Sequence, residues 1–395
     1  VQVPTRHQHL RCFHINHSNY YMLIFSKINI NNYWGNIKMR TKIKSNNIWI
    51  IILLSFYLSA CDVADTVVNN TPAGKRDYIW SRDSVEYGDL EGPIEMYSMW
   101  GSSPNDVWGA SFRAADLRNS FWHYDGKKWS RAIFDTPLSI HGNGSIEIGG
   151  VWGTAQNNVW GFGLRQHSNP EWFEPFVMKY DGTTWTEVLG DKNNMPFGFH
   201  RIRAIDENNF WITASGNITN YSNGVWKRYS IEKLTAYAVS VIGSNVYATA
   251  YYAGKNTLYL LKKQVDFFIK IDSTDLFHGK FGVNGLDVIS DEIYYYGYDG
   301  IYKAQIVNGE IDINSWKNCV HVYDGGLYYA TINSVKDICI VGWSKDLYHY
   351  NGTDWQAIEI DVSRYGNISG LEGIWGDGKE LFICDPYEGI VYHGK

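Results

Sequence analysis

The sequence predicts an all-β fold built from repeated units. Two observations carry this prediction: a Trp-Gly motif that recurs at matching positions, and Asp-Gly or Asn-Gly dipeptides that follow it at similar spacing. Aromatic residues make up 16% of the chain, which has 17 Trp and 29 Tyr but only 9 Pro. Such a composition favours strands, because rings pack well on a pleated surface.

The repeat is clearest in two successive units. Segment 100–109 (WGSSPNDVWG) returns as 152–161 (WGTAQNNVWG), and segment 123–129 (HYDGKKW) returns as 179–185 (KYDGTTW). Weaker copies occupy 207–226, 244–269, 291–316, 335–355 and 379–394. The sequence therefore contains seven units. We expect the Trp residues at these repeated positions to pack in the core.

Each unit parses into four short strands, named a to d. Strand a covers 96–100, 148–152 and 371–375, strand b covers 107–110 and 159–162, and strand c covers 121–124, 177–180 and 347–350. The Asp-Gly or Asn-Gly between strands c and d suits the positive φ angles of two-residue hairpins. Four antiparallel strands repeated every 40 to 50 residues or so are typical of a propeller blade.

The seventh unit ends at Lys395, where its c-to-d turn is expected. Segment 79–85 (IWSRDSV) resembles the d-strand segment 128–133 (KWSRAI). We therefore expect this N-terminal strand to complete the last blade. The fold class is then a seven-bladed β-propeller of four-stranded antiparallel blades whose ring is closed by an N-terminal strand. Six or eight blades remain alternatives, because some units diverge.

Residues 39–60 have the three parts of a secretory signal in order. Arg40, Lys42 and Lys44 form a positive region, 48–57 (IWIIILLSFY) form an apolar region, and 58–61 read LSAC. The apolar stretch is shorter than the roughly 20 residues that span a bilayer. The alternative is a short core helix with an incidental cysteine.

The LSAC segment resembles the lipobox of bacterial lipoproteins. The resemblance implies that the Cys61 thiol is acylated, for example with palmitate, and that this lipid anchors the protein in the cell envelope, in the outer membrane. We interpret 1–38 as sequence upstream of a start at Met39, 61–77 as a flexible tether, and 78–395 as the propeller.

The combination of SPNDVWG with HYDGxxW resembles the repeats of bacterial secreted propeller proteins. This resemblance covers nearly all of 78–395, and it implies a fold but no function. The longer Asp-x-x-Thr-Gly-x-x-x-Trp repeat of pyrroloquinoline quinone dehydrogenases is absent from the sequence.

Charge and motifs exclude several classes of function. The net charge is -6 and no basic run follows the leader, which argues against a nucleic-acid partner. We predict no cofactor or metal, because the Cys and His residues lack ligand spacing. His123, His349 and His393 share one c-strand position and are interpreted as structural. Cys319 is unpaired in this interpretation, and a bridge between Cys339 and Cys384 stays open.

The connections between strands b and c and between strands d and a are long and varied, so the face that they form is the candidate binding face. Its candidate residues are Arg113, Arg165, His167, Trp172, Phe173, Glu174, Tyr251, Asp299, Lys345 and Glu388. We predict a non-catalytic binding or scaffolding module for a protein or a glycan. The alternative is an envelope glycan hydrolase or lyase that uses carboxylates such as Glu174, Asp299 or Glu388.

Overall fold

A computed structural model describes residues 73–85, 96–111, 121–132, 146–166, 173–289, 291–322, 326–343, 347–360, 368, 370–386 and 388–395. The predicted leader and Cys61 lie outside the described residues. Among the described residues, no helix is long and apolar enough to cross a bilayer.

The described strands form six antiparallel sheets. The first sheet contains β2 (Met96–Ser103), β3 (Asp106–Ser111), β4 (Phe121–Tyr124) and β5 (Trp129–Arg131). The second contains β6 (Ile146–Ala155), β7 (Asn158–Gln166), β8 (Phe173–Tyr180) and β9 (Trp185–Glu187). The third contains β10 (Arg201–Asp206), β11 (Asn209–Ser222), β12 (Val225–Ile242), β13 (Asn245–Tyr252), β14 (Thr257–Lys263) and β15 (Phe268–Asp275).

The fourth sheet contains β16 (Asn284–Ile289), β17 (Glu292–Gly297), β18 (Gly300–Val307), β19 (Glu310–Ile311) and β20 (Lys317–His321). The fifth contains β21 (Leu327–Ser334), β22 (Asp337–Gly342), β23 (Leu347–Tyr350) and β24 (Trp355–Ile358). The sixth contains β25 (Glu372–Gly376), β26 (Leu381–Asp385), β27 (Ile390–Gly394) and β1 (Trp80–Ser84). A short 3₁₀ helix, η4 (Ala253–Lys255), connects β13 to β14.

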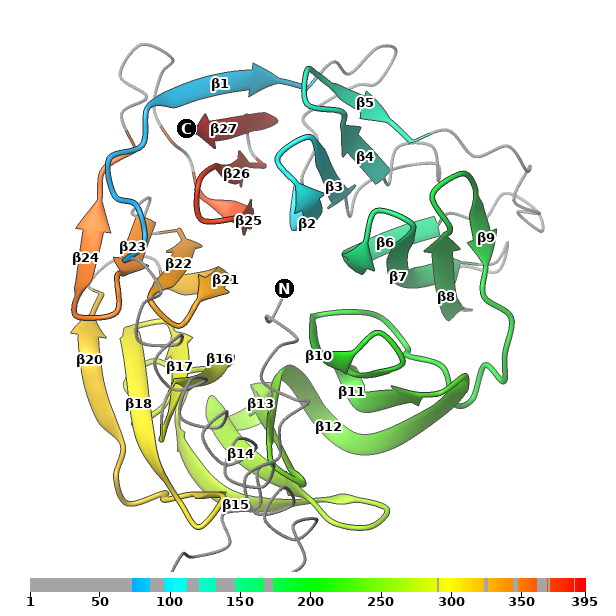
Figure 1. Ribbon diagram of the computed structural model, residues 1–395. Coiled ribbons are helices and arrows are strands. Elements are labelled where there is room, and N and C mark those ends of the chain that lie inside the picture. Colours follow the sequence, from blue (N-terminus) through cyan, green and yellow to red (C-terminus); the bar gives the residue numbers. More distant parts are fainter. Residues whose placement is uncertain are drawn as a thin grey trace, which may run out of the picture. The chain divides into compact units, whose positions relative to one another are not determined.

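These sheets stand around a common centre, with β2, β6, β21 and β25 innermost in the four-stranded sheets and β5, β9, β24 and β1 outermost (Figure 1). The all-β propeller of antiparallel blades that the repeats predict is therefore present. Gly126, Gly182 and Gly352 have the predicted positive φ angles, of 88°, 96° and 95°. The prediction of two-residue hairpins was wrong, because the strands c and d pair at Tyr124 with Trp129, Tyr180 with Trp185 and Tyr350 with Trp355, which leaves four residues in each turn.

The number of separate sheets differs from the seven that we predicted. The third and fourth repeats share one six-stranded sheet because β12 runs on without a break. Its first part pairs with β11 between Val225 and Ser230, and its second part pairs with β13 between Thr235 and Ile242. The intervening residues 231–234 contain no Gly or Pro, but Lys233 has a positive φ of 62°, so the backbone bends there although one strand serves both repeats.

The N-terminal strand of the described chain joins its C-terminal strand. β1 pairs antiparallel with β27, from Trp80 opposite Gly394 to Ser84 opposite Ile390. The pairing places β1 in the outermost position of the sixth sheet.

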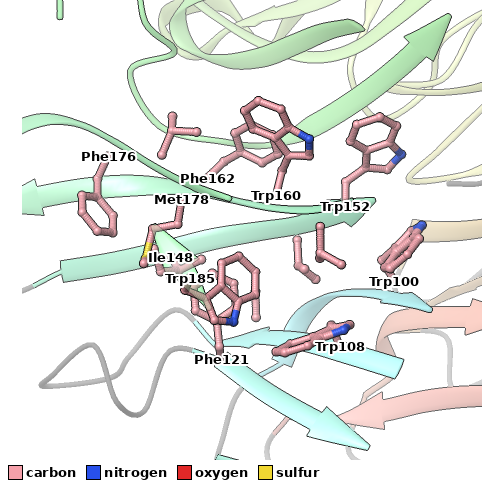
Figure 2. Packing of buried hydrophobic residues seen from close by; sticks show 14 of the residues in the cluster. Trp100, Trp108, Phe121, Ile148, Trp152, Trp160, Phe162, Phe176, Met178 and Trp185 are labelled. Carbon is pink, nitrogen blue, oxygen red and sulfur yellow. The ribbon is translucent and has the colours of Figure 1, made fainter. Parts of the chain in front are cut away.

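Aromatic side chains from successive repeats pack edge to face. The ring centroids of Trp108 and Trp185 lie 5.2 Å apart at an interplanar angle of 80°, and both rings are buried between neighbouring sheets (Figure 2). The same arrangement recurs in Trp160 with Trp226, Trp211 with Phe268, and Phe382 with Trp129. Such geometry suits the ring quadrupoles and confirms that the repeated Trp residues are core residues.

One polar pair also recurs between strands b and c. Its first member lies at the start of strand b or directly before it. In six repeats its second member lies on strand c, opposite the residue two positions after the first member. In the third repeat both members lie on β11, where Asn220 Nδ2 donates to Asn209 Oδ1 at 3.2 Å. Seven such pairs occur in the described chain: Asp106 with His123, Asn158 with Lys179, Asn209 with Asn220, Asn245 with Lys262, Glu292 with Lys303, Asp337 with His349, and Glu380 with His393. This recurrence agrees with the structural interpretation of the three histidines.

Candidate functional site

A cavity of about 590 Å³ occupies the middle of the ring of sheets. It is lined by the innermost strands β2, β6, β10, β16, β21 and β25 and by the second part of β12. Tyr251, Phe277 and Tyr298 add side chains from the b-to-c and d-to-a connections. The cavity therefore belongs to the face formed by the b-to-c and d-to-a connections, which we predicted to be the binding face. We call it the cavity face.

Aromatic rings dominate the lining of this cavity. The lining includes Tyr97, Phe199, Tyr237, Tyr251, Phe277, Tyr296, Tyr298, Tyr328, Tyr329 and Trp375. Burial raises the pKa of Tyr237, Tyr296 and Tyr329, and the nearby Arg201 guanidinium opposes this rise in all three. These hydroxyls are therefore protonated at neutral pH and can donate hydrogen bonds.

Positive charge enters the lining from β10. Arg201 and Arg203 both line the cavity, and among its described lining residues there is no Asp or Glu. The Arg201 guanidinium reaches across to β21, where Nη2 donates to the Tyr328 carbonyl oxygen and the Tyr329 ring lies 4.5 Å away. A second donor, Nη1, bonds the His200 carbonyl oxygen at 2.7 Å.

His200 adds a neutral side chain beside Arg201. Its Nδ1 lies 2.8 Å from the Ala236 carbonyl oxygen and therefore donates to it, and its ring stacks on Tyr237 at 5.0 Å. Burial lowers the pKa of His200, and the adjacent Arg201 charge lowers it further. The imidazole is therefore uncharged at neutral pH, and Arg201 and Arg203 supply the positive charge.

Four rings lead from the cavity to the surface. Phe277 contacts Tyr298 at 5.0 Å, Tyr298 contacts Tyr328 at 5.7 Å, and Tyr328 contacts Trp343 at 5.3 Å between ring centroids. We call these four residues the aromatic arc. Phe277 and Trp343 are exposed at 42% and 51%. The buried Glu372 carboxylate accepts a bond from Trp343 Nε1 at 3.2 Å and orients this indole.

Arg165 is placed in the interior and away from solvent. Its guanidinium bonds Glu174 at 3.0 Å and Glu187 at 2.6 Å, and it lies 4.6 Å from the Phe176 ring. The side chain is only 7% exposed, so it ties β7, β8 and β9 together. The Glu174 carboxylate is correspondingly engaged in this network and is not a free acid.

The remaining candidates are spread over the ring. Tyr251 lines the cavity, and Asp299 follows the aromatic-arc residue Tyr298. Phe173 is exposed at the start of β8, and Glu388 lies in the β26–β27 turn. The predicted site residues Arg113, His167, Trp172 and Lys345 lie outside the described residues, as does Cys61.

A second polar cluster lies inside the fifth sheet. Asp337, Cys339 and His349 are buried, with possible ligand atoms within 4.8 Å of one another. Arg76 Nε donates to His349 Nδ1 at 3.1 Å, so His349 Nε2 carries the proton that Asp337 Oδ1 accepts at 2.8 Å. Both imidazole nitrogens are therefore used, which fits a structural hydrogen-bond chain better than a metal site. No disulfide joins Cys339 and Cys384, so the bridge left open by the sequence is not formed.

Sequence reasoning missed the residues that define the cavity. Arg201 and Arg203 alternate on an innermost strand, where the clearest repeats have apolar or small residues. That alternation of charge on a predicted inner strand is a signal that could have identified them. Asn284, Tyr328 and Trp343 carry no comparable signal in the sequence.

Comparison with known proteins defines the class of fold. The structure is similar to that of YCF48 bound to D1 peptide, with 14% identity and a TM-score of 0.53 over 82% of this chain and 97% of that one. It is similar to the WD40 β-propeller domain of Doa1, with 11% identity and a TM-score of 0.51 over 80% of this chain and 97% of that one. A GH74 xyloglucanase from Xanthomonas campestris gives 10% identity and a TM-score of 0.52, over 79% of this chain and 53% of that one.

These likenesses establish a β-propeller fold and extend no further at such identities. No protein-family model matches the sequence, and a comparison with curated proteins gives no match.

Proposed function

We propose that this protein is a lipid-anchored envelope lipoprotein whose β-propeller is a non-catalytic binding module for a protein or glycan. The ligand occupies the central cavity and the aromatic arc. One observation carries this proposal: the cavity is lined by ten aromatic side chains and two arginines, and its described lining contains no carboxylate. Apolar pockets with a few convergent polar groups are the usual form of a binding site.

A glycan hydrolase or lyase is the alternative, and the cavity disfavours it. Such an enzyme commonly needs two carboxyl groups about 5 to 10 Å apart. Glu174 is tied to Arg165, and neither Asp299 nor Glu388 is among the described lining residues. Binding without catalysis is therefore the better-supported function.

The binding proposal is tested by capture in the native host. The full-length tagged protein is crosslinked in cells, purified and compared with the separate variants Arg201→Gln and Trp343→Ala. Lys127→Gln is the matched control, because Lys127 is exposed in the β4–β5 turn on the opposite face. We expect both cavity-face variants to lose the captured ligand and the control to retain it. Undiminished capture by both variants would reject the cavity as the site.

Lipid anchoring rests on the signal-like segment 39–60 and the cysteine that follows it. More than one acyl chain is needed for stable anchoring, since each buried CH₂ contributes about 0.8 kcal/mol. Radiolabelled palmitate fed to the host should label the wild type and leave Cys61→Ser unlabelled. Equal labelling of both proteins would contradict acylation at Cys61.

The docking of residues 73–79 bears on the direction in which the cavity opens. Gly74 N donates to the Lys336 carbonyl oxygen, and Arg76 bonds Asp354. Lys336 and Asp354 lie in the β21–β22 and β23–β24 turns, on the face opposite the cavity face. A tether that leads from Cys61 to this face would direct the cavity away from the lipid.

Seven blades closed by β1 remain our interpretation of the ring. The seven b-to-c polar pairs support it, as does the contact of Trp211 with Phe268, which repeats the inter-blade geometry inside the six-stranded sheet. Seven inner strand segments also line the cavity. In this interpretation β12 supplies the last strand of one blade and the first strand of the next.

A further inference from the structure

The Arg201 charge has no counter-ion among the described residues. Its guanidinium donates two hydrogen bonds to backbone carbonyl oxygens, those of His200 and Tyr328, and its aromatic neighbours Tyr296 and Tyr329 are neutral. A guanidinium has five N–H donors, so these two bonds leave donors available. A partly buried cation without a partner is costly, and an anionic ligand would remove this cost.

A second buried group in the same cavity lacks a partner. Asn284 lines the cavity beside β21 and is 1% exposed. Its Nδ2 donates to the Leu327 carbonyl oxygen at 3.3 Å, whereas its Oδ1 has no hydrogen-bond donor. Buried amide oxygens are normally bonded, so a donor from a ligand is expected here.

The aromatic arc supplies a third kind of contact. Its rings follow one another in steps of 5.0 to 5.7 Å from the cavity to the exposed Trp343. Phe277 and Trp343 at its two ends are exposed, Tyr298 and Tyr328 between them are partly buried, and successive rings are tilted by 44° to 88°. The exposed parts of these rings offer separate flat apolar surfaces to a ligand that also presents a series of flat faces. The pyranose rings of a saccharide have such faces, and their hydroxyls both donate and accept hydrogen bonds.

We infer that the cavity binds an acidic saccharide, a uronate-containing glycan, and this inference rests on the proposed binding function. The uronate carboxylate bonds the Arg201 guanidinium, a ring hydroxyl donates to Asn284 Oδ1, and neighbouring sugars lie on Tyr328 and Trp343. A carboxylate-terminated peptide satisfies Arg201 equally well. It lacks the repeated flat faces that the aromatic arc would contact, so the saccharide is favoured.

The inference is tested on the purified full-length protein by titration calorimetry. The probes are an oligogalacturonate, the same oligomer with its carboxylates methyl-esterified, and a peptide with a free C-terminal carboxylate. We expect the acid to bind. The ester should bind at least roughly tenfold more weakly, because the charge-assisted hydrogen bonds to Arg201 are lost. Equal binding of acid and ester would overturn the role of the carboxylate. Binding of the peptide alone would overturn the saccharide.

Variants locate the bound sugar. Trp343→Ala removes an exposed ring and should weaken the acid and the ester by similar factors. Arg201→Gln should weaken the acid and leave the ester unchanged, and Lys127→Gln should alter neither. Arg201 also bonds two backbone carbonyls, and its replacement removes these bonds. If Arg201→Gln does not fold, the comparison of acid with ester on the wild-type protein still tests the inference. If no saccharide binds while crosslinked capture still depends on the cavity, the ligand class is wrong and the binding function stands.

Discussion

Glycine in the repeated Trp-Gly motif is required by the neighbouring blade. A Cβ at Gly153 would lie 2.8 Å from the Trp100 ring, and a Cβ at Gly101 would lie 2.8 Å from the Trp375 ring. Real Cβ atoms do not approach a ring that closely, so a larger residue would force the tryptophan out of its position. The glycines of this motif are therefore required by a contact between repeats as well as by a local turn.

We expect Gly153→Ala to lower the free energy of unfolding by about 1 to 3 kcal/mol, because it overpacks this contact. Gly149→Ala on the same strand is the control, since its Cβ would meet its nearest atom at 3.4 Å. Urea unfolding followed by tryptophan fluorescence measures both. If Gly149→Ala is as unstable as Gly153→Ala, overpacking against the Trp100 ring is not the reason why alanine destabilises β6.

The lowered pKa of His200 predicts one component of the pH dependence of the free energy of unfolding. Its pKa is lowered in the folded protein from the usual 6.5, so the unfolded chain binds the proton more readily. The contribution of His200 to stability is therefore complete above pH 6.5 and is lost as the pH falls through the folded pKa. His200→Gln should remove this component from urea unfolding measured between pH 7.5 and pH 5, and His278→Gln, an exposed site, should not.

The three described cysteines should differ in reactivity. Cys319 is exposed on β20, whereas Cys339 and Cys384 are buried. Burial raises the pKa of Cys339 well above the ordinary range, which keeps it a thiol. Mass-spectrometric mapping after brief alkylation of the native protein should find the label on Cys319. Labelling of Cys339 at a similar rate would show that the fifth sheet opens readily.

At the scale of elements, the segment before β1 is attached to the fifth sheet. The Arg76 guanidinium bonds His349, Asp354 and Gln356, with distances of 2.9 to 3.2 Å. The predicted flexible tether reached residue 77, but residues 74 and 76 are bonded to a sheet. The segment 73–79 thus links the fifth sheet to the sixth, where β1 begins.

Replacing Arg76 should release this segment. Arg76→Ala should speed amide exchange at Gly74, whose N–H bonds the Lys336 carbonyl oxygen, and should lower stability by about 1 kcal/mol or more. Lys75→Ala is the matched control, because the interaction described for Lys75 is with the Tyr78 ring, whose centroid lies 5.3 Å from Nζ. Unchanged exchange at Gly74 in Arg76→Ala would show that the segment is held by other contacts.

At the scale of the whole molecule, β1 covers the outer edge of β27. Without β1, the backbone of β27 would be an unpaired sheet edge, which is a template for association between chains. A chain lacking residues 73–85 should therefore form oligomers or aggregates in size-exclusion chromatography with light scattering, at concentrations where the intact chain is monomeric. A monomeric truncated chain with unchanged thermal stability would mean that β1 is dispensable.

Local patterns in the sequence were sufficient for the repeat, the strands and the turns. Trp100-Gly101 and Asp125-Gly126 carry this information because side-chain periodicity and positive φ are properties of a few adjacent residues. The pairing of the N-terminal strand with the last repeat could also be predicted, since 79–85 and 128–133 look alike. The merger of two repeats by β12 could not, because it depends on how the backbone bends through 231–234, where Lys233 has a positive φ.

The binding site was decided only by the tertiary structure. Arg165 looked like a loop residue in the sequence and is buried between two glutamates, whereas Arg201 attracted no attention and crosses the cavity. Arg201, Asn284 and the pair Tyr328 and Trp343 belong to three different repeats, and no local pattern indicates which inner strands face one another. The sequence by itself determined a β-propeller with an expected lipid anchor at Cys61. The packing of the sheets around a common centre decided which side chains share the cavity, because this proximity arises from contacts between residues far apart in the chain.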